Sequence, residues 1–164
     1  QVNGNVKANS FEYTSSKTFY YSIPPSGFIS PVHSTVSPGN PSYEFFESNG
    51  DYTLYTNGAN YQFVAPVYLP DNATVTGLTV YGIDNISENL NITLRRRLHE
   101  SSIYITMCNL QSSGTPGDFE ISSTSISFPV ITNQYNNFTI YAEGVGFDIR
   151  IKSVRITYTL PQAQ

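Results

Sequence analysis

The residues best suited to catalysis in this chain are carboxylates, because paired Asp and Glu side chains can act as the acid and base of a glycosidase. Six acidic residues stand where folding could bring two of them together: Asp51, Asp71, Asp84, Glu88, Glu100 and Asp118. Most of them lie in turn sequences, where Asp caps free backbone groups. This placement predicts that the chain is not an enzyme.

A search for nucleophiles, metal ligands and cofactor loops finds no established motif. The chain has no Gly-x-Ser-x-Gly elbow, no His-Glu-x-x-His pair and no phosphate-binding glycine loop. Its single cysteine, Cys108, lies in the apolar stretch "IYITMCNL", which predicts a buried and unreactive thiol, and neither His33 nor His99 has a partner motif. We therefore expect no catalytic residue, no cofactor and no metal.

The loop "DNISEN", residues 84–89, is rich in the oxygen ligands that calcium prefers. It lacks the ligand spacing of an EF-hand loop, so the sequence favours an ordinary polar loop. A calcium site is the alternative interpretation of these residues.

Arg95, Arg96 and Arg97 form a local cluster of positive charge. With a period of two, Arg95 and Arg97 share a face with Thr93, while Arg96 shares the opposite, apolar face with Leu94. We expect Arg96 at the edge of the core, paired with a carboxylate or with carbonyl groups, since an unpaired buried charge is costly. The other two are interpreted as an exposed strand end, with binding of an anionic group such as a sugar carboxylate as the alternative.

Composition favours strands and argues against nucleic acid as a partner. Charged residues are only 12% of the 164 residues, and the net charge is −4 with eight Lys and Arg, whereas phosphate binding needs clustered positive charge. Abundant Ser, Thr, Asn and Tyr fit strands better than helices. No apolar run reaches the roughly 18 residues that a transmembrane helix needs, so we expect no membrane insertion.

Short candidate strands recur along the chain, separated by turn sequences such as "SNGD", "LPDN" and "GTPGD". We expect strands at residues 2–8, 17–23, 43–47, 51–55, 61–69, 74–83, 90–98, 103–110, 123–128, 137–142, 147–151 and 154–160. This spacing is typical of an all-β fold, an antiparallel β-sandwich that is jelly-roll-like. We expect less than about a tenth of the chain to be helical.

The last two candidate strands differ in phase. Apolar residues occupy odd positions over 145–151 and even positions over 154–160, so the alternation slips at Lys152 and Ser153. A slip without Gly or Pro favours a β-bulge within one continuous strand. A tight turn at the same place is the alternative.

The stretch "YQFVAPVYLPDNATVTGLTVYGID", residues 61–84, reads as two strands joined by a corner. Together with "FYYSIP", "LNITLRRRL" and the terminal "SVRITYTLP", it resembles a group of secreted, functionally uncharacterised microbial β-domains with a VAPVxLPxxAxVxxL core motif, matched within Phe63–Asp84. The resemblance covers residues 17–161 and implies an exported all-β domain. It carries over no catalytic residue.

Tyrosine-rich stretches are a candidate binding surface. "TFYYS", "SYEFFES" and "DYTLYTNGANY" could line a sugar-binding platform, since Tyr presents a flat face together with a hydroxyl group. The chain has 13 Tyr but no Trp. Its absence favours packing in the core and between strands over a sugar platform.

Four N-glycosylation sequons are present, at Asn72, Asn85, Asn91 and Asn137. In a chain so rich in Asn, Ser and Thr, roughly three would arise by chance, so their number proves nothing. Three of them lie at strand starts or loops on positions predicted to face outward, where a glycan could be accommodated.

The N-terminus has a strand pattern of its own. The candidates for a subunit contact are small and apolar, and alternate with polar residues: Val2, Gly4, Val6 and Ala8. We therefore divide the chain into an N-terminal strand or tail at residues 1–16 and a β-sandwich domain at residues 17–164. The strand could pair within its own domain, or complete the sandwich of a neighbouring copy as a donor strand. Gln1 in place of Met suggests a mature chain from which a leader was removed, although a chain trimmed at this end would begin in the same way.

These observations predict a non-enzymatic protein that is extracellular or on the cell surface. Our first hypothesis is a structural protein that polymerises with copies of itself into a filament or surface layer, because head-to-tail strand donation gives an open polymer. The alternative is a secreted carbohydrate-binding or adhesive module with glycans as partners.

Overall fold

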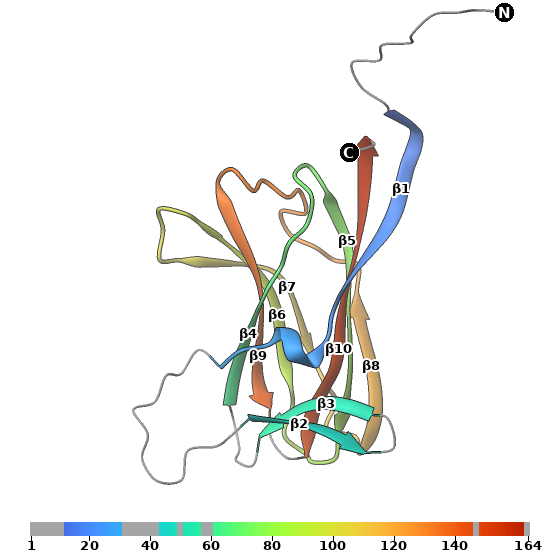
Figure 1. Cartoon of the computed structure of the whole chain (residues 1–164), viewed down its shortest axis with the longest axis vertical. Coiled ribbons are helices and arrows are strands. Elements are labelled where there is room, and N and C mark those ends of the chain that lie inside the picture. Colours follow the sequence, from blue (N-terminus) through green and yellow to red (C-terminus); the bar gives the residue numbers. More distant parts are fainter. Residues whose placement is uncertain (1–11, 31–42, 49–50, 57–60, 146–147, 163–164) are drawn as a thin grey trace, which may run out of the picture.

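The computed structural model describes residues 12–30, 43–48, 51–56, 61–145 and 148–162. These residues form ten β-strands and one short 3-10 turn, η1, Pro25–Gly27. All strand pairings among them are antiparallel, and the strands make two sheets that face each other (Figure 1). The predicted all-β, jelly-roll-like sandwich is confirmed.

The larger sheet has six strands in the order β2-β3-β10-β5-β8, with β1 also paired to β10. Its strands are β1 (Glu12–Ile23), β2 (Tyr43–Ser48), β3 (Asp51–Thr56), β5 (Thr74–Asp84), β8 (Gly117–Ser123) and β10 (Ile149–Gln162). β2 and β3 run across the lower end of the molecule in Figure 1, where Leu54 of β3 pairs with Ile151 of β10.

The smaller sheet has four strands in the order β4-β9-β6-β7. They are β4 (Tyr61–Pro66), β6 (Asn91–Leu98), β7 (Tyr104–Gln111) and β9 (Asn136–Val145). The end of the β6–β7 hairpin extends outward from the sandwich (Figure 1). Pro66 ends the edge strand β4, as expected for a residue that cannot donate a ladder hydrogen bond.

The core lies between the two sheets and follows from the period of two. Phe63 and Ala65 of β4 and Leu78 and Val80 of β5 are all buried, as their alternation predicts. Each large apolar side chain buried in this way contributes about 1.5 to 3 kcal/mol. Cys108 is buried in β7, as predicted, and burial raises the pKa of its thiol.

The phase slip near the C-terminus is a β-bulge, as predicted. β10 is continuous, and its register against β5 shifts between Ile151, which pairs with Gly82, and Ser153, which pairs with Tyr81. Lys152 is the extra residue. The bulge lets Ile151 and Val154 both face the core although they are three positions apart.

The prediction for residues 123–128 is wrong, because the strand in this region is β8 and ends at Ser123. Beyond it, the Ser123 hydroxyl accepts a hydrogen bond from the backbone N–H of Ser125, and Phe128 has a positive φ of 51°. Local side-chain bonding of Ser to the backbone competes with a strand ladder, which explains the early end.

The four N-terminal contact candidates, Val2, Gly4, Val6 and Ala8, lie outside the described residues. β1 begins at Glu12, ahead of the predicted boundary at Lys17, and pairs with β10 of its own chain. Within the described ranges, no helix is long and apolar enough to cross a membrane.

Candidate functional site

The outer face of the four-stranded sheet carries a row of arginine and tyrosine side chains. Pairing sets Arg95 of β6 beside Thr139 of β9, and sets Arg97 between Asn137 of β9 and Tyr104 of β7. The buried residues of β6 are its even-numbered ones, so odd-numbered Arg95 and Arg97 face away from the core. The face predicted for these two arginines is confirmed.

Arg95 is held between two aromatic rings. Its guanidinium carbon lies 4.2 Å from the ring centre of Tyr104 and 3.9 Å from that of Tyr141. Both distances fall within the range of a cation–π interaction. Burial lowers the pKa of Arg95, and the proximity of the two tyrosines opposes that shift. The stack holds the positive charge of Arg95 at a defined place on the sheet.

Next to this stack the surface is hollowed, with a volume of about 450 Å³. The lining combines aromatic, cationic and amide side chains from four segments: Pro66, Val67, Tyr68, Arg97, Tyr104, Asn133, Asn136, Asn137, Phe138 and Thr139. Tyr68 is 75% exposed and Tyr104 is 44% exposed. The hollow therefore presents two accessible tyrosines beside an arginine.

Hydrogen bonds fix the segment that forms one wall of the hollow. The backbone N–H of Asn133 donates to Asp71 Oδ1 at 2.8 Å, and Asn133 Nδ2 donates to the Leu69 carbonyl at 2.9 Å. Asn136 Nδ2 donates to Thr132 Oγ1 at 2.7 Å. These bonds tie the segment before β9 to the β4–β5 turn and fix the position of this wall of the hollow.

Three polar atoms at the hollow, Asn136 Oδ1, Arg97 Nε and Thr139 Oγ1, have no hydrogen-bond partner within the described part of the chain. Asn136 is only 6% exposed, and its Oδ1 is buried without a hydrogen bond. Arg97 Nε is likewise buried without an acceptor. Because buried polar groups are nearly always hydrogen-bonded in native proteins, these three atoms are the groups at the hollow that could still take part in a hydrogen bond.

Arg96 sits at the edge of the core as predicted, but its expected partner is wrong. Its guanidinium carbon lies 4.2 Å from the ring centre of Phe128, and its Nε has no hydrogen-bond partner among the described residues. The predicted carboxylate or carbonyl is thus replaced by an aromatic ring. A ring face attracts a cation without needing a second charge in the core.

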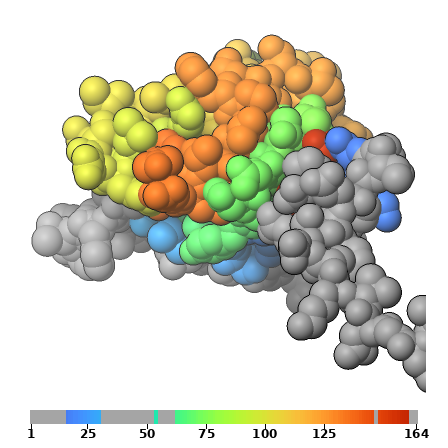
Figure 2. Space-filling view, turned by 90° about the horizontal axis from the view of Figure 1, so that it is seen from above, coloured from blue at the N-terminus to red at the C-terminus, as the bar shows by residue number. Residues whose placement is uncertain are grey.

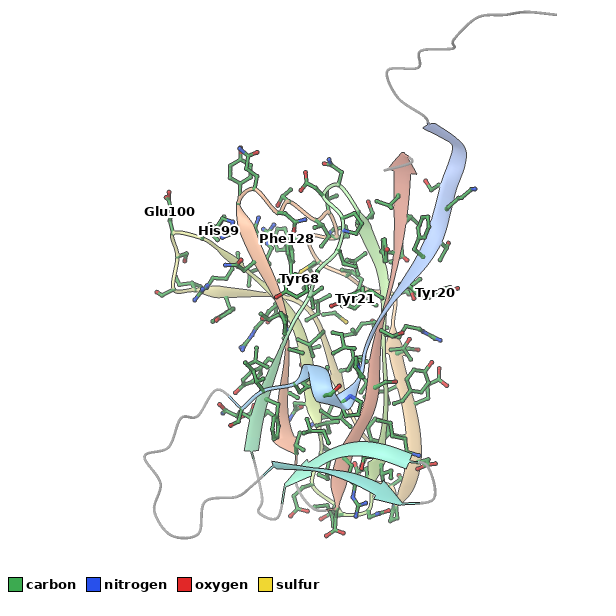
Figure 3. All side chains as sticks on the ribbon, viewed as in Figure 1. Tyr20, Tyr21, Tyr68, His99, Glu100 and Phe128 are labelled. Atoms are coloured by element: carbon green, nitrogen blue, oxygen red, sulfur yellow. The ribbon has the colours of Figure 1, made fainter. Side chains whose placement is uncertain are left out.

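A second hollow of about 410 Å³ lies at the end of the β6–β7 hairpin. Its lining is Leu98, His99, Glu100, Ser101, Gln134 and Tyr135. His99 Nε2 contacts the Asn133 carbonyl at 3.2 Å, and the His99 N–H donates to the Tyr135 carbonyl at 3.0 Å. Figure 3 shows His99 and Glu100 at this projecting end, and Figure 2 shows the hairpin beside the segment that leads into β9.

Asp84 is a structural residue. It is 1% exposed, and its carboxylate accepts hydrogen bonds from the Ser112 hydroxyl and from the backbone N–H groups of Ile86 and Gly114. The Ser112 hydroxyl in turn accepts from the Leu90 N–H at 2.9 Å. Donors within the protein thus occupy both carboxylate oxygens of Asp84, which favours a polar loop at residues 84–89 over a calcium site.

The other carboxylates considered for catalysis are spread over the molecule. Asp71 lies in the β4–β5 turn, Glu100 lies at the hairpin end, and Asp118 in β8 forms an ion pair with Lys152 at 3.2 Å. Glu88 is exposed in the loop before β6, and the side chain of Asp51 lies outside the described residues. In the described part of the chain, no three His, Cys, Asp or Glu residues could hold a metal ion.

The sequons differ in accessibility. Asn72, Asn85 and Asn137 are exposed, and Asn137 lies at the hollow. Asn91 is half-buried on the sheet, between Glu143 of β9 and Gln111 of β7. Glycosylation at all four stays a prediction, and Asn91 is the least open of them.

The sequence did not indicate the tyrosines of the hollow. Within the predicted aromatic clusters, Tyr20 is exposed on the larger sheet, whereas Phe19 and Tyr21 pack against the core. Tyr68 and Tyr104 lie outside those clusters. Only the register of β6 against β7 and β9 brings Tyr104 to the arginines. That register is not readable from a strand pattern alone.

No protein-family model matches this chain, and no curated protein matches it. Among solved structures, it is similar to the xylan-binding module CBM15, with a TM-score of 0.50 and 18% sequence identity, over 90% of this chain and 100% of that one. It is also similar to the CBM22-2 xylan-binding domain of Xyn10C from Paenibacillus barcinonensis, with a TM-score of 0.46 and 12% identity, over 88% of this chain and 99% of that one. The chain therefore shares the β-sandwich fold of the first module.

Proposed function

We propose that this protein is a non-catalytic carbohydrate-binding module that holds a polysaccharide against the outer face of its four-stranded sheet. The observation that carries this proposal is the hollow beside β6 and β9, where exposed Tyr68 and Tyr104 flank Arg97. The proposal takes up the second of the two functions predicted from the sequence.

The chemistry of the hollow suits a sugar. The ring of Tyr68 can offer a flat apolar face to the C–H face of a sugar ring, while Tyr104, whose ring lies against Arg95, can offer its hydroxyl group to a sugar hydroxyl. Amide groups at Asn136 and Asn137 add further polar partners. A volume of about 450 Å³ also lies within the range of small-molecule sites, roughly 300 to 1,000 Å³.

The fold supports a polysaccharide as the ligand. The module with which this chain shares its fold binds xylan. Fold alone does not establish function, so the argument depends on the hollow, and the shared fold makes a xylan-type chain the first ligand to test.

A binding role without catalysis agrees with the placement of the carboxylates. Asp84 is engaged in the core and Asp118 in an ion pair, so neither stands at the hollow as a free acid or base. Xylans are polysaccharides of cell walls, and we therefore place the module in the extracellular space or on the cell surface.

The filament hypothesis rests on residues 1–9, which lie outside the described residues. It stays a prediction. In the described part of the chain, β1 pairs with β10 of the same molecule.

The first test is retardation of the protein in native gels that contain soluble polysaccharides, including neutral and acidic xylans. We expect the natural chain to be retarded by a xylan. Tyr68→Ala should weaken this binding about tenfold, equivalent to about 1.4 kcal/mol, because it removes an exposed ring from the hollow.

Tyr20→Ala is the matched control, since Tyr20 is 65% exposed on the other sheet. It should bind like the natural chain. Absence of retardation by every polysaccharide in the series would contradict the proposed function, as would equal losses in the two variants.

A further inference from the structure

The hollow carries positive charge that its own lining does not neutralise. Arg97 lines it, and Arg97 Nε is buried without an acceptor. None of the described residues that line this hollow is Asp or Glu. The guanidinium therefore meets a bound molecule without a competing carboxylate beside it.

Arg95 strengthens the charge at this end of the sheet. It lies two positions before Arg97 on the same face, and its guanidinium is held between Tyr104 and Tyr141. It therefore adds a fixed positive potential next to the hollow. The ring of Tyr104 also lies 5.2 Å from the guanidinium carbon of Arg97, so the same ring orients both arginines.

One negative charge of this sheet, Glu143, lies at the other end of the face. Glu143 pairs with Asn91, whereas Arg97 pairs with Asn137, so six residues of strand, about 20 Å, separate the acid from the hollow. Glu143 also accepts a hydrogen bond from Gln62 at 3.3 Å. Two arginines would thus attract an anionic group at the hollow, and Asp71, which accepts a hydrogen bond from the backbone N–H of the lining residue Asn133, would oppose them in part.

From this arrangement we infer that the site selects an acidic polysaccharide, one whose sugar residues include a carboxylate, as in a uronic acid. The inference rests on the proposed function. Arginine matches a planar carboxylate through parallel hydrogen bonds, and the unpartnered Asn136 Oδ1 can accept from a neighbouring sugar hydroxyl. A long polyphosphate is a poor match, because the whole chain has a net charge of −4.

The test uses one polymer in two forms, a glucuronic-acid-substituted xylan and the same xylan after chemical reduction of its carboxyl groups to alcohols. We expect the natural chain to bind the acidic form about 10 to 100-fold more tightly, as for one charge-assisted hydrogen-bonded pair. Arg97→Gln should bind both the acidic and the reduced xylan with the affinity that the natural chain has for the reduced form.

Arg155→Gln is the matched control. Arg155 also lies near two tyrosine rings, 5.6 Å from Tyr20 and 5.4 Å from Tyr81, and has a buried Nε without a partner, but it belongs to the other sheet. This variant should keep the preference for the acidic form. If Arg97→Gln does not fold, the comparison of the two polymers on the natural chain still decides the question.

The outcomes separate the two proposals. Equal binding of the acidic and reduced polymers by the natural chain would overturn the inference and leave the proposed function standing. Binding to neither polymer would overturn both. A preference that survives in Arg97→Gln would overturn the assignment to Arg97, and equal loss of both polymers in that variant would show a merely structural role.

Discussion

Arginine in this protein is stabilised by aromatic rings more than by acids. Arg95 lies between Tyr104 and Tyr141, and Arg96 lies over Phe128. A chain in which charged residues are only 12% has few carboxylates to pair with arginine, and it has 13 Tyr and 10 Phe. Such pairs keep the cation charged while leaving its donors available to a ligand.

Asp84, unlike these arginines, is a buried residue held by hydrogen bonds within the protein, and its replacement should lower the stability of the fold. Asp84→Ala removes the acceptor of three donors in a buried position, at Ser112, Gly114 and Ile86. We expect the free energy of unfolding to fall by about 3 kcal/mol, since unsatisfied buried donors cost about 1 to 3 kcal/mol each and part of this cost is relieved by relaxation.

Urea denaturation followed by circular dichroism measures this change. Asp118→Ala is the control, because its side chain is 72% exposed and its ion pair with Lys152 is worth about 1 kcal/mol or less. Similar losses in the two variants would contradict the structural role of Asp84.

Among the elements, β5 lies between β10 and the edge strand β8 of the larger sheet. Its glycine at position 82 allows a close approach. A Cβ added to Gly82 would lie 2.4 Å from Phe119 Cζ and 2.4 Å from the Arg150 carbonyl oxygen. Position 82 therefore requires glycine for space.

Gly82→Ala should lower the free energy of unfolding by about 1 to 3 kcal/mol through overpacking. Gly77→Ala in the same strand should be tolerated, because a Cβ there would meet its nearest atoms at 3.6 Å, an ordinary contact. Thermal unfolding of the two variants checks this contrast. Equal melting temperatures of the two variants would contradict the close approach of Phe119 and Arg150 to position 82.

Most elements could be predicted from the sequence because alternation and turn residues act locally. The bulge at Lys152 was readable as a change of phase, and the apolar face of β6 as a period of two. β8 was missed because its strict alternation places only two large apolar residues, Phe119 and Ile121, against the core, and because the Ser-rich segment after it resembles a strand in composition.

The candidate site was harder to predict, since it depends on which strands are neighbours. Arg97 was singled out from the sequence as a member of a charge cluster. The hollow around it needs Tyr68 from the β4–β5 turn and Asn136 from the start of β9, both distant in the chain. Local patterns contain no information on such pairings.

At the scale of the whole molecule, the sandwich presents an arginine with tyrosines on the outer face of each sheet. The Arg155 group lies on the six-stranded sheet, and the Arg95 group lies beside the hollow on the four-stranded sheet. The two groups contain the same kinds of side chain, but they differ in the shape of the surrounding surface, which is hollowed beside the Arg95 group. The account assigns binding to the hollowed face, so the two faces should behave differently toward a polysaccharide.

The measurement that tests this central claim most directly is an NMR titration of the ¹⁵N-labelled chain with xylo-oligosaccharides that carry glucuronic acid. We predict that the amide signals of Tyr68, Arg97, Tyr104 and Asn137 shift with a common saturable dependence on ligand, while those of Tyr20, Tyr81 and Arg155 stay in place. Shifts confined to the six-stranded sheet, or no shifts at millimolar ligand, would contradict a glycan-binding site on the four-stranded sheet.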